Sequence, residues 1–179
     1  IQFRDLPLLY GRVPKVANSS IKACLCRLLT TSPEQGSRTT SDAFWSKGTH
    51  GETSMTDKYS ARMRRGTHFS FSFVRNPFDR LVSAYNNKIL ELDEVPGPMQ
   101  AMGLSHKMGF PAFLECIAGT VDAAMDVHLL PQSSILCLDG QLIPNFIGRL
   151  ESMATDWQQL ETCMNRPPLP PLVNPPGQK

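Results

Sequence analysis

Long hydrophobic runs, paired cysteines and a strong net charge are all missing from this sequence of 179 residues. No window approaches the roughly 18 consecutive apolar residues of a transmembrane helix, so we expect no membrane segment in this chain. The five cysteines include no CxxC pair, which argues against a disulfide framework and a zinc site. A net charge of +2 is too small to indicate a general nucleic-acid binder. We therefore expect no metal and no nucleic acid, and any basic site must be local.

The length and the hydrophobic content of 41% predict one domain over residues 1–179, with a sizeable core. Proline is concentrated at the end of the chain. Because proline cannot continue a helix, we predict that residues 166–179 form an extended tail across the surface.

The most informative segment begins with a β-like run at residues 8–10, followed by a lysine, two serines and a helical periodicity. Apolar spacing predicts a helix over residues 19–29, with Ser19 as its N-cap. A helix N-terminus offers unpaired N–H groups and a positive dipole end, to which Lys15 adds a charge and Ser20 a hydroxyl. This corner of the chain is therefore predicted to bind phosphate or sulfate.

The first corner differs from a Walker A loop, which has the pattern G-x-x-x-x-G-K-[ST]. Here Lys15 follows Pro14, and the preceding Gly11 stands alone. The corner is similar to a phosphate-binding loop in its place in the chain, but not in its sequence. An ordinary strand exit with a solvated Lys15 is the alternative.

A second strand–turn–helix unit occupies the middle of the chain. Alternation of phenylalanine with small polar residues predicts a strand over residues 69–74. Asn76 is the predicted N-cap of the next helix and Pro77 its first residue. The predicted buried stripe of this helix consists of Phe78, Leu81, Val82 and Tyr85.

The rest of the chain continues the alternation of strands with helices. Periodicity predicts strands at residues 133–138 and 145–150, helices at residues 110–117 and 151–164, and a long polar loop at residues 30–51. Such alternation is typical of an α/β fold, in which a mainly parallel central sheet lies between helices in three layers. The carboxyl ends of parallel strands meet at one edge, so Lys15 and Arg75 are expected to face one ligand.

The motif VRNPFDRLVSAY, residues 74–85, resembles the 3′-phosphate-binding signature of sulfotransferases. In that signature an arginine leaving a strand and a serine eight residues later grip the 3′-phosphate of 3′-phosphoadenosine 5′-phosphosulfate (PAPS). Arg75 and Ser83 occupy these places, about two helical turns apart. The guanidinium of Arg75 offers a planar fork that suits phosphate oxygens.

Three more blocks occur in the order that the same family has. The sequence PKVANSS, residues 14–20, is similar to its 5′-phosphosulfate loop, P-K-x-x-x-[ST]-[ST]. Residues 126–132 and 146–151 resemble the H-W-x-P-Q and (V/I)-G-(K/R)-x-E blocks of carbohydrate sulfotransferases, a group that includes the chondroitin and dermatan enzymes and many bacterial relatives. Leu129 stands where the first of these blocks has tryptophan.

The resemblance implies a P-loop-nucleotide-kinase-like sulfotransferase fold and the transfer of a sulfuryl group from PAPS to a carbohydrate hydroxyl, with PAP as product. It assigns donor binding to Pro14, Lys15, Val16, Ala17, Asn18, Ser19, Ser20, Arg75 and Ser83. Lys15 is also expected to stabilise the leaving PAP, and no metal is required. Catalysis then depends on positioning and electrostatics.

The acceptor hydroxyl needs a general base, for which histidine or glutamate is the usual choice. His50 lies in the polar loop where related glycosaminoglycan sulfotransferases carry a catalytic histidine. His128 belongs to a better-matched block. Glu52 and Glu151 are the alternatives.

Two other functions are compatible with the same residues. One is a P-loop-type nucleotide phosphotransferase, and the other is a non-catalytic member of the family that binds PAP or a sulfated ligand. The thiol pattern favours a cytoplasmic location, as in the bacterial relatives. A eukaryotic protein whose anchor has been removed would instead lie in the Golgi lumen, as the animal relatives do.

Overall fold

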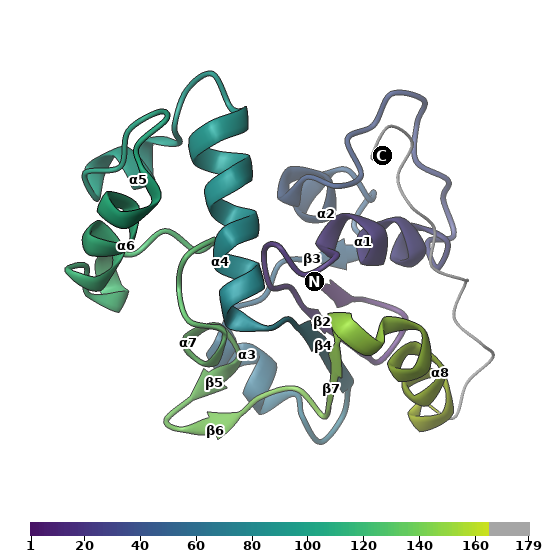
Figure 1. Cartoon of the computed structure of the whole chain (residues 1–179). Coiled ribbons are helices and arrows are strands. Elements are labelled where there is room, and N and C mark those ends of the chain that lie inside the picture. Colours follow the sequence, from purple (N-terminus) through teal and green to yellow (C-terminus); the bar gives the residue numbers. More distant parts are fainter. Residues whose placement is uncertain (165–179) are drawn as a thin grey trace.

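A computed structural model of the chain describes residues 1–164 and shows a mixed sheet between helices (Figure 1). The strands are β1 (Gln2–Phe3), β2 (Leu8–Gly11), β3 (Thr53–Ser54), β4 (Phe69–Val74), β5 (Cys137–Leu138), β6 (Gln141–Leu142) and β7 (Phe146–Arg149). The α-helices are α1 (Asn18–Cys26), α2 (Asp42–Lys47), α3 (Lys58–Met63), α4 (Pro77–Tyr85), α5 (Gly97–Ala101), α6 (Phe110–Ala118), α7 (Gln132–Leu136) and α8 (Met153–Cys163). A π-helix, η1 (Asn86–Glu91), continues α4, and the 3-10 helices are η2 (Asp122–Ala124) and η3 (Leu150–Ser152). The predicted tail at residues 166–179 lies outside the described residues.

The main sheet has the strand order β3-β1-β2-β4-β7. Strand β2 pairs in parallel with β4, and β4 with β7, whereas β1 is antiparallel to both β2 and β3. The predicted mainly parallel sheet is therefore a mixed one. The short connection from β1 to β2 allows only antiparallel pairing, because a parallel crossover needs a dozen or more residues.

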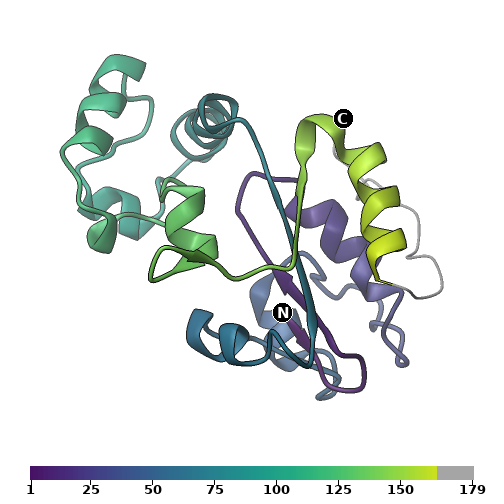
Figure 2. The same ribbon diagram turned by 90° about the horizontal axis from the view of Figure 1, so that it is seen from below.

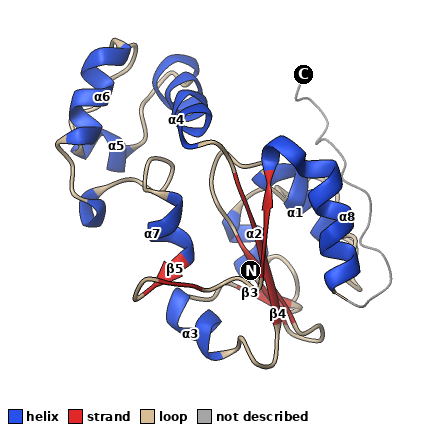
Figure 3. Cartoon of the chain, turned by 60° about the horizontal axis from the view of Figure 1, so that its bottom comes forward, coloured by secondary structure: helices blue, strands red, loops and turns tan. Residues whose placement is uncertain are grey.

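Helices cover both faces of this sheet, so the α/β prediction is confirmed. Helices α1 and α8 lie on one face, and α3 and α7 lie on the other (Figures 1 and 3). Aromatic residues fill the core between the sheet and α8. Tyr10 stacks on Phe71 with ring centroids 5.2 Å apart, and Phe73 stacks on Trp157 at 6.0 Å. A Cβ atom at Gly148 would overlap the ring of Phe73, which explains the glycine in β7.

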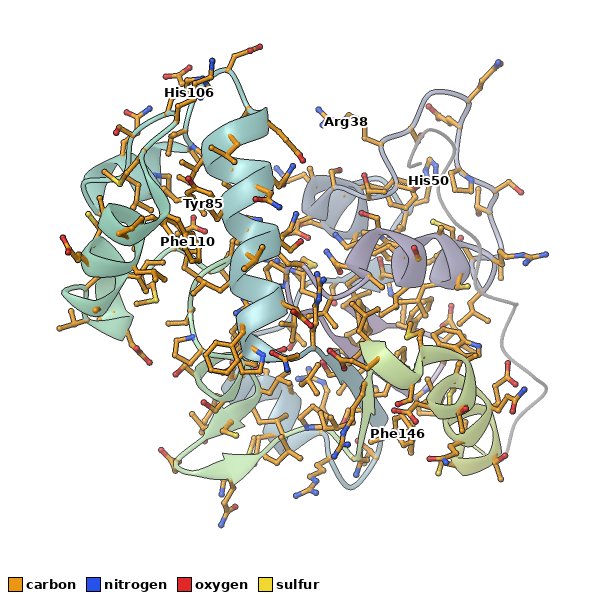
Figure 4. All side chains as sticks on the ribbon, viewed as in Figure 1. Arg38, His50, Tyr85, His106, Phe110 and Phe146 are labelled. Atoms are coloured by element: carbon orange, nitrogen blue, oxygen red, sulfur yellow. The ribbon has the colours of Figure 1, made fainter. Side chains whose placement is uncertain are left out.

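A second hydrophobic core lies to one side of the sheet, among α4, η1, α5 and α6 (Figure 2). Its fully buried members include Ala84, Ile89, Met99 and Phe113. Tyr85 packs against the rings of Phe110 and Phe113 and donates a hydrogen bond to the carbonyl of Met108 (Figure 4). This helical region is a separate packing unit in contact with the sheet.

The structure corrects several of the local predictions. The predicted strand at residues 133–138 is α7, with Pro131 as its N-cap, followed by the short β5, because a short apolar run does not distinguish the two states. The first helix begins at Asn18 and ends at Cys26, and its N-cap is Ala17, not Ser19. The long loop predicted at residues 30–51 contains α2.

The predicted buried stripe of α4 is also wrong in part. Phe78 is 77% exposed and Val82 is 43% exposed, whereas Arg80 and Ala84 are buried. Helix α4 therefore presents a charged residue to the interior. Within residues 1–164, no helix has the length and apolar composition needed to cross a membrane.

Candidate functional site

A cavity of about 560 Å³ lies beyond the carboxyl ends of β2, β4 and β7. It brings together most of the residues that the sequence predicted to bind the donor. Its lining includes Pro14, Lys15, Ala17, Asn18, Ser19, Ser20, Arg75, Ser83 and His128. Val16 is absent from the lining because its side chain is buried in the hydrophobic core beneath the loop.

The first corner leaves the start of α1 open. Lys15 and Ala17 have positive φ angles of 66° and 44°, which turn the chain sharply before the helix. Ala17 is the N-cap of α1, and its side chain cannot accept a hydrogen bond. Among the described residues, no capping side chain therefore competes with a ligand for the first N–H groups of α1. The side chain of Asn18 is held from below, where it accepts a hydrogen bond of 3.2 Å from the Tyr10 hydroxyl. This arrangement is suited to an anion.

Lys15 is half-buried beside the cavity and close to other cations. Burial lowers its pKa from the usual range, the charges of Lys88 and Arg75 lower it further, and Glu91 acts in the opposite direction. Within residues 1–164 no carboxylate forms an ion pair with Lys15. The ammonium group is therefore available to an anionic ligand.

The second corner, in contrast, is closed by side chains. Asn76 Oδ1 accepts hydrogen bonds from the backbone N–H groups of Phe78 and Asp79, as the sequence predicted. Gln132 clamps the backbone of Arg75, since its Oε1 accepts from the N–H at 3.0 Å and its Nε2 donates to the carbonyl at 2.7 Å. Glu151 accepts the N–H of Asn76 at 2.6 Å.

The two corners also touch directly. Nη1 of Arg75 donates a hydrogen bond of 3.3 Å to the carbonyl of Lys15. A second hollow, of about 570 Å³, continues from the first along α4 and η1, and the two share Lys15, Arg75, Ser83 and Asn87. The shared residues mark the point where both ligand-sized spaces meet.

His128 lies at the cavity in a defined orientation. Its Nδ1 is 2.7 Å from Oδ1 of Asp126, which also accepts the backbone N–H of His128 at 2.8 Å. Because a carboxylate only accepts, Nδ1 carries the proton and Nε2 keeps its lone pair. Burial lowers the pKa of His128, Asp126 opposes this shift, and the charges of Lys88 and Lys15 add to it. His128 is therefore suited to accept a proton.

The other candidate bases lie elsewhere. His50 is exposed on the loop after α2 and does not line the cavity (Figure 4). Glu52 accepts the N–H groups of Thr30 and Thr31, and these bonds lower its pKa to about 2. The hydrogen bond from Asn76 likewise lowers the pKa of Glu151. Both carboxylates are committed to main-chain N–H groups near the ends of helices.

Sequence reasoning missed Asp126, Gln132 and Arg80 as individual residues. Asp126 and Gln132 stand at the two ends of the recognised block at residues 126–132, so their places were visible without their roles. The signal for Arg80 was a charged residue on the side of α4 that faces Ala84, which only the structure identifies as buried. The sequence offers Glu151 as an alternative base, whereas in the structure its carboxylate accepts the N–H of Asn76.

Comparisons with known proteins agree with these features. The sequence model of the Sulfotransferase family matches residues 1–175. Carbohydrate sulfotransferase 14 of Mus musculus and that of Homo sapiens are each 30% identical over 122 residues, which cover 60% of this chain and 31% of the relative. The match thus spans about a third of the length of these relatives. No solved structure matches this chain.

Proposed function

This chain belongs to the Sulfotransferase family, and from that membership we propose that it transfers the sulfuryl group of PAPS to a hydroxyl of a carbohydrate, in a sulfotransferase fold of the P-loop-kinase type. One observation carries the proposal: a single cavity is lined by the open corner at Lys15, by Arg75 and Ser83 at the second corner, and by an oriented histidine, His128. Anion-binding groups and a proton acceptor therefore share one space.

The donor fits the two corners in one orientation. The N–H groups at the start of α1, the hydroxyls of Ser19 and Ser20 and the ammonium of Lys15 suit the 5′-phosphosulfate. Arg75 and Ser83 suit the 3′-phosphate, because a guanidinium matches two phosphate oxygens at once. The direct contact between Arg75 and the Lys15 carbonyl sets the spacing of these two anion sites.

His128 is proposed as the general base. Its Nε2 accepts the proton of the acceptor hydroxyl, whose oxygen then forms the new bond to sulfur. The bond from sulfur to the bridging oxygen breaks, and PAP leaves with the electron pair. Lys15 stabilises the negative charge that develops on that oxygen. No covalent intermediate on the protein is needed.

A carbohydrate acceptor is proposed from the relatives, both of which are called carbohydrate sulfotransferase 14. The second hollow, along α4 and η1, supports this choice. Asn87 and Glu91 line it with groups of the kind that hydrogen-bond to sugar hydroxyls. The acceptor would then approach the transfer point from the side of the helical region.

Calorimetry with PAP and with ADP tests the donor site. PAP should bind more tightly than ADP to the parent chain, because only PAP has a 3′-phosphate. Arg75→Ala should weaken PAP binding by about 10- to 100-fold, the equivalent of roughly 1.5–3 kcal/mol for hydrogen bonds to a charged group, and weaken ADP binding much less. Arg27→Ala, at the far end of α1 and outside the cavity, is the matched control.

Three results would contradict parts of this proposal. Equal affinity for PAP and ADP would favour a nucleotide phosphotransferase and remove the 3′-phosphate site. Tight PAP binding without turnover of labelled PAPS on a panel of glycans would leave a non-catalytic binding protein. Turnover on a non-carbohydrate hydroxyl alone would reject the acceptor class.

A further inference from the structure

Arg80 is a buried charged residue that takes no part in the proposed chemistry. It is only 5% exposed and lies on α4 between Arg75 and Ser83. Its guanidinium donates hydrogen bonds to three main-chain carbonyls: from Nε to Pro14 at 2.9 Å, from Nη1 to Leu130 at 2.8 Å and from Nη2 to Val127 at 3.1 Å. These carbonyls belong to two segments that are far apart in the sequence.

Each of these segments carries a residue of the proposed reaction. Pro14 immediately precedes Lys15, and Val127 immediately precedes His128. One planar side chain on α4 therefore holds the main chain beside the donor-binding lysine and the main chain beside the proposed base. Because the guanidinium is rigid, it fixes the relative positions of the three carbonyls that it binds, and so of the two segments.

The backbone near Lys15 needs such support. Lys15 and Ala17 both adopt positive φ angles, which cost free energy for residues other than glycine. Conformations of this kind persist where the surrounding structure enforces them. The hydrogen bonds of Arg80 to Pro14 and of Arg75 to Lys15 hold the first half of this turn from the side of α4.

The charge of Arg80 is unusual for a residue that serves only packing. Burial lowers its pKa to about 10, so the group stays protonated at neutral pH. In the described part of the chain no carboxylate pairs with it. Carbonyl dipoles are its partners, and an isolated buried charge is costly unless it is well hydrogen-bonded.

Resting on the proposed function, we propose that Arg80 is a positioning residue that keeps Lys15 and His128 at a fixed relative position across the cavity. Arg75 and Ser83 lie on or beside the helix that carries Arg80, so their 3′-phosphate site does not depend on its side chain. The backbone at Pro14, before Lys15, and the backbone at residues 127–130, around His128, do depend on the side chain of Arg80. Loss of Arg80 should therefore affect sulfuryl transfer far more than PAP binding.

The test compares Arg80→Lys and Arg80→Gln with the parent chain. Lysine keeps the charge but reaches fewer carbonyls, and glutamine removes the charge. We expect kcat with PAPS to fall by about 10- to 100-fold, as a misplacement near 1 Å can cause. The fold-change in the dissociation constant of PAP should be at least ten times smaller than the fold-change in kcat. Phe113→Leu, in the core of the helical region, is a control for lost stability.

Circular dichroism and thermal unfolding are measured for all variants, with kinetics at temperatures where each is folded. A variant of Arg80 with parental kcat would overturn the proposal. So would Phe113→Leu losing as much kcat at a matched drop in unfolding midpoint, or both Arg80 variants failing to fold, since either result makes Arg80 a purely structural residue. A parent chain that neither binds PAP nor turns over PAPS would instead remove the proposed function, and this inference with it.

Discussion

The two strand–turn–helix corners of this chain lie side by side at one edge of the sheet, and they differ in how the helix N-terminus is capped. At the first corner, Ala17 gives α1 no side-chain cap, and the backbone turns through two residues with positive φ. At the second, Asn76 caps α4, Pro77 occupies its first turn, and Glu151 accepts the N–H of Asn76. One helix start is open and the other is closed.

This difference indicates what each corner can do. Uncapped N–H groups can bind a ligand directly, so the first corner offers its backbone to an anion. The second corner satisfies its backbone internally, with Gln132 holding both polar groups of Arg75. The second corner is therefore a rigid support for two side chains that line the same cavity. These are the guanidinium of Arg75 and the hydroxyl of Ser83.

The largest expected effect comes from a residue that belongs to neither corner. If the two corners hold the donor and His128 takes the proton, His128→Gln should lower kcat by about 10²- to 10⁴-fold, the usual contribution of general base catalysis, with PAP affinity retained. His50→Gln, on an exposed loop outside the cavity, should keep parental kcat. A large loss in His50→Gln with little in His128→Gln would reverse the assignment of the base.

The pH dependence of kcat/KM checks the same assignment. Only neutral His128 accepts a proton, so activity should fall as pH drops through its pKa in the folded chain. Burial lowers that pKa below the ordinary 6.5. On the acidic side, activity should therefore decline only below pH 6.5, and His128→Gln should lose this decline. An acidic limb with its midpoint above pH 7 would contradict the burial of His128 seen here.

Lys15→Met gives the second-largest effect and tests the open corner. Without the ammonium, charge on the leaving PAP is stabilised less, and we expect kcat to fall by about 10²- to 10³-fold, as for loss of one oxyanion-stabilising group. The unfolding midpoint should stay the same or rise, because Lys15 is desolvated and close to Lys88 and Arg75. Full kcat in Lys15→Met, measured with labelled PAPS at saturation, would show that the first corner does not contact the reacting group.

The sequence predicted the second corner more completely than the first. Asn76 and Pro77 are residue types with strong positional preferences, so the start of α4 could be placed to the residue. The first corner follows a tertiary constraint. Its positive φ angles are held by Arg75 and Arg80 of the second corner, and no local pattern predicts Ala17 as a cap. The predicted Ser19 cap was wrong for this reason.

The candidate site shows the same division. Lys15, Arg75 and Ser83 could be grouped because parallel strands bring their carboxyl ends to one edge. His128 could not be preferred to His50 without the structure, since a histidine in a loop has no periodicity that reveals its direction. Its partner Asp126 and its depth at the cavity became visible only with the long connections between α6 and β7 in place.

The smallest expected effect is the most direct test of the comparison. Asn76→Ala should lower the free energy of unfolding by about 1 kcal/mol, the typical worth of an N-cap, since its Oδ1 accepts the N–H groups of Phe78 and Asp79. Ser19→Ala should leave it nearly unchanged, because Ser19 is not the cap of α1. Affinity for PAP should show the reverse order, with a loss of roughly 1 kcal/mol in Ser19→Ala alone. Urea unfolding and calorimetry on the two variants measure both quantities.

Equal losses of stability in the two variants would mean that Ser19 caps its helix as Asn76 does. The N-terminus of α1 would then be capped like that of α4. Fewer of its backbone N–H groups would be left to bind a phosphosulfate.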